Sequence, residues 1–219
     1  AIYRWRLGSL RRRASELEDV IDQRTSALRE QTDRLLESDR EKSILVARLK
    51  AQSEDFERLS LEDALTGIGN RRNLDDRLAK AFERALETRL PLSFALFDID
   101  EFKRINDQYS HAAGDHALVA VAQALQQGVD GRGSIARWGG EEFAALFEGM
   151  PLEDARQLCE QLRERVQAID CGEFAPGWSI TISGGVTERT GLSHHEKLVS
   201  RADSLLYEAK RAGRNRICG

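Results

Sequence analysis

Cysteine, proline and long apolar runs are scarce in this sequence, and each scarcity excludes a class of protein. The three cysteines, Cys159, Cys171 and Cys218, form no CxxC pair. Neither a disulfide framework nor a zinc site is therefore predicted, and a reducing cytosol fits best. No stretch of about 18 apolar residues is present, so the sequence predicts no membrane span. The three prolines and the 32% of charged residues exclude collagen-like and low-complexity chains.

The charge balance is mildly acidic. Among 219 residues, 33 Lys and Arg face 37 Asp and Glu, for a formal net charge of −4. This balance gives no general reason to expect nucleic-acid binding, so no nucleic-acid partner is predicted. The length allows one domain of catalytic size plus an appendage.

Composition changes sharply near residue 60. Residues 1–60 contain no proline and one glycine, whereas residues 61–219 contain the other 16 glycines and all three prolines. We expect residues 1–60 to form a long coiled-coil helix that dimerises through residues 8–60, and residues 61–219 to form a globular domain. The alternative is a solvated single helix. The heptad seam comprises Leu10, Ala14, Leu17, Ile21, Leu28, Leu35, Leu45, Leu49, Phe56 and Leu59.

The first thirteen residues are basic and partly aromatic. They contain five arginines and no acid, together with Tyr3 and Trp5. Such a cluster is typical of the cytoplasmic edge of a transmembrane helix. We therefore expect a longer protein tethered on the cytoplasmic side of the inner membrane, and the alternative is a basic, solvated helix end.

The second part alternates helical and strand patterns, which predicts an α+β domain with a mostly antiparallel central sheet flanked by helices. Glycines at 139 and 140 make a hairpin of the two middle strands. The expected helices are 73–88, 115–126, 152–168 and 196–211, and the expected strands are 92–99, 134–138, 142–147, 179–186 and 215–218.

Two acidic clusters suggest chemistry. Asp98 and Asp100 end a buried strand, and Glu141 and Glu142 follow the glycine pair at the hairpin. Each cluster alone has an explanation without function: the strand-end aspartates could be structural carboxylates, and the glutamates could lie in a solvated turn. Together, a strand-end Asp and a hairpin Glu are hard oxygen ligands suited to Mg²⁺ and nucleotidyl transfer.

Five ordered motifs in residues 61–218 resemble those of the GGDEF-domain diguanylate cyclases. The resemblance implies a palm-like fold related to nucleotide cyclases, and a reaction in which a homodimer condenses two GTP into cyclic di-GMP and two pyrophosphates. The motifs are 63–72 (DALTGIGNRR), 97–107 (FDIDEFKRIND), 114–115 (GD), 137–143 (RWGGEEF) and 202–215 (ADSLLYEAKRAGRN).

The resemblance also implies roles for single residues. Asp98, the carbonyl of Ile99 and Glu141 would hold Mg²⁺ or Mn²⁺, and Glu142 would be needed for catalysis. Asp100 is expected to be a structural carboxylate instead. The remaining roles are guanine reading by Asn106 and Asp115, phosphate contact by Lys103, Lys210 and Arg214, a catalytic contribution by Lys103, and packing of Phe102 near the ribose or phosphate.

Some positions have alternative explanations or depart from the family pattern. Asp115 could instead be the N-cap of the following helix. Asp130 and Gly133 stand where many members carry the Arg and Asp of an inhibitory product site, so product inhibition is expected to be weak or absent. The adjacent His194 and His195 are not expected to bind a metal.

Three functions are therefore compared: an active cyclase, a catalytically inactive nucleotide-binding receptor, and a coiled-coil signalling scaffold. The clustered acids and phosphate-facing cations favour the cyclase, because an inactive site has no physical use for costly clustered charge.

Overall fold

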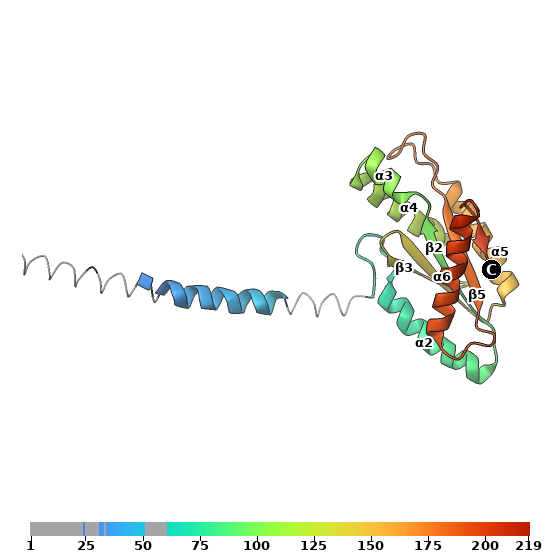
Figure 1. Ribbon diagram of the computed structural model, residues 1–219, viewed down its shortest axis with the longest axis horizontal. Helices are drawn as coiled ribbons and strands as arrows, with labels where there is room; N and C mark the ends of the chain where they lie inside the picture. Colours follow the sequence, from blue (N-terminus) through green and yellow to red (C-terminus); the bar gives the residue numbers. More distant parts are fainter. Residues whose placement is uncertain (1–23, 25–30, 33, 51–60) are drawn as a thin grey trace, which may run out of the picture. The chain divides into compact units, whose positions relative to one another are not determined.

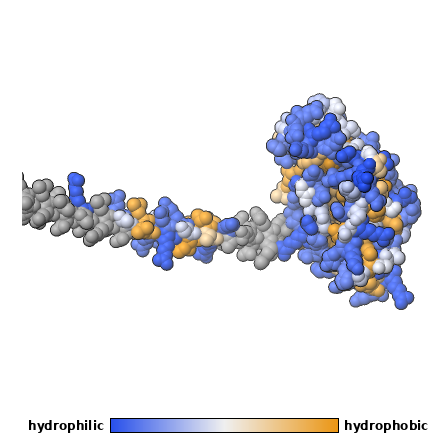
Figure 2. Space-filling model, viewed as in Figure 1, coloured by the Kyte–Doolittle hydropathy of each residue, from blue (hydrophilic) through white to orange (hydrophobic). Residues whose placement is uncertain are grey.

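The computed structural model describes residues 24, 31–32, 34–50 and 61–219, and the chain divides into two units, 1–59 and 60–219. Each unit is described by itself. Residues 34–50 are helical (Figure 1) and carry apolar side chains that are more than half exposed. Figure 2 shows these side chains on the helix surface among polar ones. They are Leu35, Leu36, Ile44, Leu45, Val46 and Leu49.

Three of these exposed residues, Leu35, Leu45 and Leu49, belong to the predicted heptad seam. At 100° per residue, Leu35, Leu45, Val46 and Leu49 share one face of the helix. The other seam positions and the basic cluster of residues 4–13 lie outside the described residues, so the coiled coil stays a prediction. No helix in the described ranges is both long enough and apolar enough to cross a bilayer.

The second unit is built on a six-stranded mixed sheet in the order β1-β3-β4-β2-β5-β6 (Figure 1). The three central pairings, β3 with β4, β4 with β2, and β2 with β5, are antiparallel, and the two edge pairings are parallel. The predicted sheet is therefore confirmed in its antiparallel centre. The strands are β1 (Gly69–Asn70), β2 (Leu92–Ile99), β3 (Ser134–Gly139), β4 (Glu142–Glu148), β5 (Ile182–Glu188) and β6 (Ile217–Cys218).

Helices cover both faces of this sheet. One core lies under α2 and α6 and includes Phe94 and Leu206, whereas the opposite core lies under α4 and α5 and includes Phe97. Every residue of β2 is buried, because this strand has helices on both sides. The helices are α2 (Arg71–Thr88), α3 (Phe102–Gln108), α4 (His111–Val129), α5 (Leu152–Gln167) and α6 (His195–Arg211).

The sequence-based boundaries need several corrections; strand β1 was not predicted, α2 begins at Arg71 and β6 begins at Ile217. The short helix α3 was not predicted, and its N-cap Glu101 has a left-handed backbone and no capping side chain. Helix α4 begins four residues before the expected position 115, because the hydroxyl of Ser110 accepts a hydrogen bond from the amide of Ala113 and caps the helix. Strand β5 begins at Ile182 rather than at 179 and ends at Glu188.

Helix α6 approaches β5 most closely at Gly185. A Cβ added there would lie 2.1 Å from the carbonyl oxygen of Ala202 and 2.4 Å from the amide nitrogen of Leu206. Both neighbours are helix backbone, which cannot rotate away as a side chain could. The absence of a side chain at Gly185 therefore sets the depth at which α6 packs on the sheet.

We expect Gly185→Ala to lower the free energy of unfolding by about 3 kcal/mol or more, because overpacking against backbone must displace the helix. Urea unfolding of the variant measures this change. Gly139→Ala is the matched control, since its added Cβ has its nearest neighbour at 3.9 Å, and it should change stability by less than about 0.5 kcal/mol. Equal stability of the two variants would contradict the close approach.

Candidate active site

Two carboxylates face each other at the end of the central strands. Asp98 on β2 pairs directly with Glu142 on β4, so both side chains lie on the same face of the sheet. Asp98 is 7% exposed, and Glu141 precedes Glu142 at the start of the strand. Like charges placed opposite each other destabilise a sheet, so this arrangement needs a compensating cation.

Lys210, from the last turn of α6, supplies one positive charge to this cluster. Its Nζ lies 2.9 Å from Oδ2 of Asp98. Burial raises the pKa of Asp98 to about 6; Lys210 opposes this rise, whereas the charges of Glu141 and Glu142 add to it. The attraction of Lys210 therefore does not offset the effect of burial and of the two neighbouring glutamates on the pKa of Asp98.

The hairpin that carries the two glutamates is held by Arg137. Its guanidinium donates to the carbonyl oxygen of Gly140 from Nε at 3.0 Å and from Nη2 at 2.8 Å. The same group contacts Asp63, with Nη1 at 3.1 Å from Oδ1. Burial works to raise the pKa of Asp63, but hydrogen bonds from Thr66 and the contact with Arg137 outweigh it and lower the pKa. The hairpin is thereby fixed to the segment that precedes β1.

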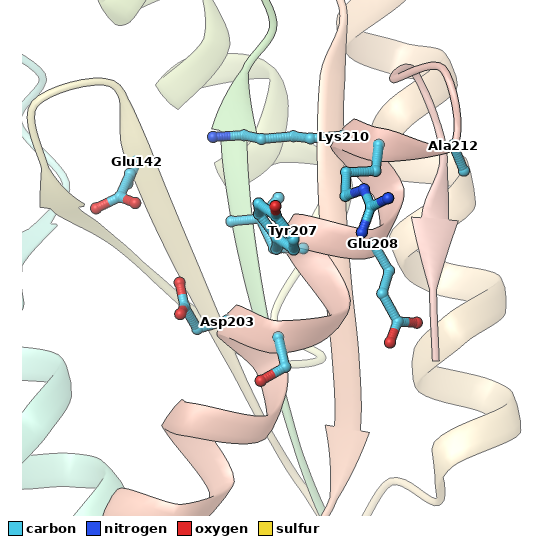
Figure 3. Close-up of a pocket in the computed structure, with 9 residues that line it drawn as sticks. Glu142, Asp203, Tyr207, Glu208, Lys210 and Ala212 are labelled. Carbon is cyan, nitrogen blue, oxygen red and sulfur yellow. The ribbon is translucent and has the colours of Figure 1, made fainter.

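An open cavity of about 720 Å³ lies beside Glu142 and along α6 (Figure 3). Glu142 borders it from the hairpin, and Lys210, Tyr207 and Asp203 border it from the helix. The amine of Lys210 extends toward the end of β2, in line with its contact to Asp98. Of the three acids, Glu142 lines this cavity, and Lys210 connects it to Asp98.

A second group of predicted residues gathers where α3 meets α4. A Cβ added at Gly114 would lie 2.0 Å from Oδ1 of Asn106 and 3.2 Å from the ring of Phe102. The missing side chain thus brings Asn106 and Phe102 against α4, one residue before Asp115. Because Ser110 caps α4, Asp115 is not the N-cap; it is exposed on the helix and free to accept hydrogen bonds from a ligand.

The remaining predicted cations are on the surface. Lys103 on α3 and Arg214, just after α6, are exposed. Asp100 has a different place from the other acids, because hydroxyl and amide donors surround its carboxylate. Its expected structural role therefore agrees with its contacts.

Residues 130–133, which lack the inhibitory motif, also lack room for its aspartate. The guanidinium of Arg132 donates to the carbonyl oxygens of Gly128 and Val129 at 2.9 and 3.3 Å, so it caps α4. A Cβ at Gly133 would lie 2.6 Å from the ring of Phe147. An aspartate side chain at residue 133 would therefore require the core to move.

Sequence reasoning missed the clamping residues. Arg137 and Asp63 stand in two of the motifs without a predicted role, and the buried Arg163 on α5 has no predicted role either. For Arg137, the sign that could have revealed its role is a basic residue two positions before a glycine pair, which suggests a guanidinium bound to exposed turn carbonyls. Arg163 gives no such sign, since it lies on an otherwise ordinary amphipathic helix.

The chain was compared with known proteins. Residues 60–216 match the family described as "Diguanylate cyclase, GGDEF domain". A similar curated protein is the diguanylate cyclase DgcP of Pseudomonas aeruginosa, 42% identical over 164 residues, which are 75% of this chain and 24% of that protein. The chain thus spans about a quarter of the length of this relative.

Solved structures are similar as well. The coiled coil and GGDEF domain of DgcB from Caulobacter crescentus, in complex with c-di-GMP, has a TM-score of 0.69 at 31% identity and covers 81% of this chain and 95% of that chain. The active GGEEF domain of a diguanylate cyclase from Vibrio cholerae has a TM-score of 0.65 at 39% identity and covers 68% and 95%. With its acidic hairpin, its helix-bordered cavity and these matches, the chain belongs to the GGDEF-domain diguanylate cyclase family.

Proposed function

We propose that this chain condenses two GTP into cyclic di-GMP and two pyrophosphates. The observation that carries the proposal is the cross-strand pair of Asp98 and Glu142 beside Lys210, open to a cavity. A partly buried cluster of like charges has a function when a cation and a polyphosphate complete it.

The donor set fits a hard divalent cation, Mg²⁺ or Mn²⁺. Asp98, Glu141 and the carbonyl of Ile99 would hold it, with phosphate and water as further ligands. Within the described ranges, no three His, Cys, Asp or Glu side chains are grouped to hold a metal by themselves, which agrees with a site that the substrate completes. When bound, such a cation stabilises negative charge that develops at the transferred phosphorus.

The chain's own residues then bind and orient the nucleotide. Asn106 and Asp115 accept hydrogen bonds from guanine, and adenine lacks the matching donors. Lys103 and Arg214 hold phosphate oxygens, and Phe102 packs beside the ribose or phosphate. Lys210, whose amine contacts Asp98, would bind a phosphate oxygen of the nucleotide. Glu142, which lies at the cavity wall, is needed for catalysis.

Catalysis needs two copies of the chain. One site holds one GTP, and each 3′-hydroxyl must meet the α-phosphate of the opposite nucleotide across a two-fold axis. We propose that residues 1–60 pair as a coiled coil and raise the effective concentration of two catalytic units, residues 61–219, to about millimolar. The apolar face formed by Leu35, Leu45, Val46 and Leu49 supports this proposal. Tethering to the cytoplasmic side of a membrane through a preceding segment also stays a proposal.

We expect the wild type to form cyclic di-GMP from GTP and Mg²⁺, and Glu141→Gln to reduce the rate at least 100-fold, because a hard anionic ligand is lost. Chromatography of the products measures turnover. The matched control is Glu153→Gln, an exposed glutamate on α5, which should keep the wild-type rate. GTP binding without product in the wild type would favour the inactive receptor instead.

We expect Asp98→Asn to stabilise the metal-free protein at pH 8 by about 2 kcal/mol while turnover is lost. Because the folded pKa of Asp98 is raised to about 6, folding is favoured when this group is protonated, and that contribution is lost as the pH rises through 6. The advantage of the variant should therefore shrink as the pH falls from 7 to 5. Thermal unfolding across this range measures it.

The control for this experiment is Asp203→Asn, an exposed carboxylate that borders the same cavity. It should change the unfolding free energy by less than about 0.5 kcal/mol at each pH. An Asp98→Asn variant that is less stable than the wild type at pH 8 would show that the aspartate is a structural residue and not a strained ligand.

We expect the double variant Leu35→Glu and Leu49→Glu to be a folded monomer that binds GTP normally and turns over at least tenfold more slowly. Charges at seam positions would be buried in the dimer. Sedimentation gives the oligomeric state, and Ile44→Glu, outside the seam, is the control. A verified monomer with full activity would remove the dimer from the mechanism.

A further inference from the structure

Asp100 is a buried carboxylate that the proposed reaction does not use. It is 6% exposed, and its two oxygens are taken up by three donors. The hydroxyl of Ser183 lies 2.7 Å from Oδ1, and the hydroxyl of Thr181 lies 2.8 Å from Oδ2. The third donor is the backbone amide of Asn215, 3.0 Å from Oδ2. This last bond joins the end of β2 to a residue 115 positions later in the chain.

Asn215 is also held from its other side. The guanidinium of Arg163, which is 9% exposed, donates to Oδ1 of Asn215 at 2.8 Å. The side-chain amide of Asn215 donates to Oε1 of Gln167 at 3.3 Å, and Arg163 donates to the same oxygen at 2.7 Å. Asp100 therefore fixes the backbone of Asn215, and two residues of α5 fix its side chain.

The turn held in this way has an unfavourable backbone. Arg214 and Asn215 are consecutive non-glycine residues with φ of 61° and 48°. The left-handed conformation is unfavourable for Arg214, whereas asparagine tolerates it better, so contacts with the surroundings help to hold this turn. The hydrogen bonds to Asn215, together with the bond from the amide of Arg214 to the carbonyl oxygen of Ala209 at 3.1 Å, are the contacts that hold it here.

The residues at the end of β2 thus contact both ends of segment 210–215, which carries Lys210, Arg211 and Arg214. Asp98 contacts Lys210 on the last turn of α6, and Asp100 contacts Asn215 directly after Arg214. Between these two contacts, the helix ends and the chain turns left-handed, so the direction in which Arg214 leaves the backbone depends on the second contact.

We propose that Asp100 is a positioning residue for substrate phosphate. With Arg163, it holds Asn215 so that the exposed Arg214 is directed toward a phosphate of GTP. This inference rests on the proposed function, in which Arg214 binds phosphate. It explains why a carboxylate, rather than a neutral group, is buried here: a charged acceptor binds two hydroxyls and one amide more strongly than an amide oxygen would.

A double-mutant cycle tests the proposal. The ligand is 3′-deoxy-GTP with Mg²⁺, which lacks the attacking hydroxyl, and calorimetry measures its affinity for the full chain. We expect Arg214→Ala and Asp100→Asn each to weaken binding about tenfold, and the double variant to be no weaker than Arg214→Ala alone, because Asp100 acts through Arg214. Guanosine, which has no phosphate, should bind all four proteins equally.

The matched control is Ser93→Ala on β2, which removes a fully buried hydroxyl that donates to the carbonyl oxygen of Met150 at 2.8 Å. It should lower stability without changing affinity for 3′-deoxy-GTP. If Asp100→Asn does not fold, Thr181→Val replaces it in the cycle and removes one of the three donors.

The outcomes separate this inference from the proposed function. Additive losses in the double variant, unchanged affinity in Asp100→Asn, or equal weakening of guanosine binding would overturn the positioning role while leaving the cyclase assignment intact. A wild type that fails to bind 3′-deoxy-GTP would overturn the proposed function and the positioning role with it.

Discussion

The structure of the catalytic unit depends on one unfavourable interaction, the crowding of Asp98, Glu141 and Glu142 at the end of the central strands, where Lys210 contacts Asp98. Burial and like charge raise the pKa of Asp98 to about 6. Such a cluster weakens the metal-free fold. The surrounding elements hold it in place, and a cation with a polyphosphate would relieve it.

Several contacts serve this cluster without belonging to it. Arg137 fixes the hairpin carbonyl of Gly140, and Gly185 lets α6 approach the sheet closely enough for Lys210 to reach Asp98. Gly114 permits a comparable close approach elsewhere in the unit, where it allows Asn106 to lie against α4. Each is a backbone or guanidinium constraint, so the site is built from rigid elements and not from mobile loops.

The sequence predicted the parts of the fold that hydrophobic patterning determines. Strand β2 was placed at 92–99 because the run LSFALFDI after Pro91 is short, apolar and aromatic, and the glycine pair marked the hairpin correctly. Helix α3 was missed because it is seven residues long and has no capping side chain, and the start of α4 was misplaced because Ser110 was not recognised as its cap. The site residues came from motifs, whereas the clamp of Asn215 by Asp100 and Arg163 joins residues far apart in sequence, which no local pattern can show.

The central claim is that the acidic cluster is strained until a cation and a nucleotide complete it. The most direct measurement is the pH dependence of the wild-type unfolding free energy, with and without Mg²⁺ and 3′-deoxy-GTP. Without ligands, the contribution of Asp98 should be lost as the pH rises through about 6, and saturating ligands should reverse that loss, with stabilisation that increases from pH 5 to pH 8. Stabilisation by the ligands that is the same at pH 5 and pH 8 would contradict the account.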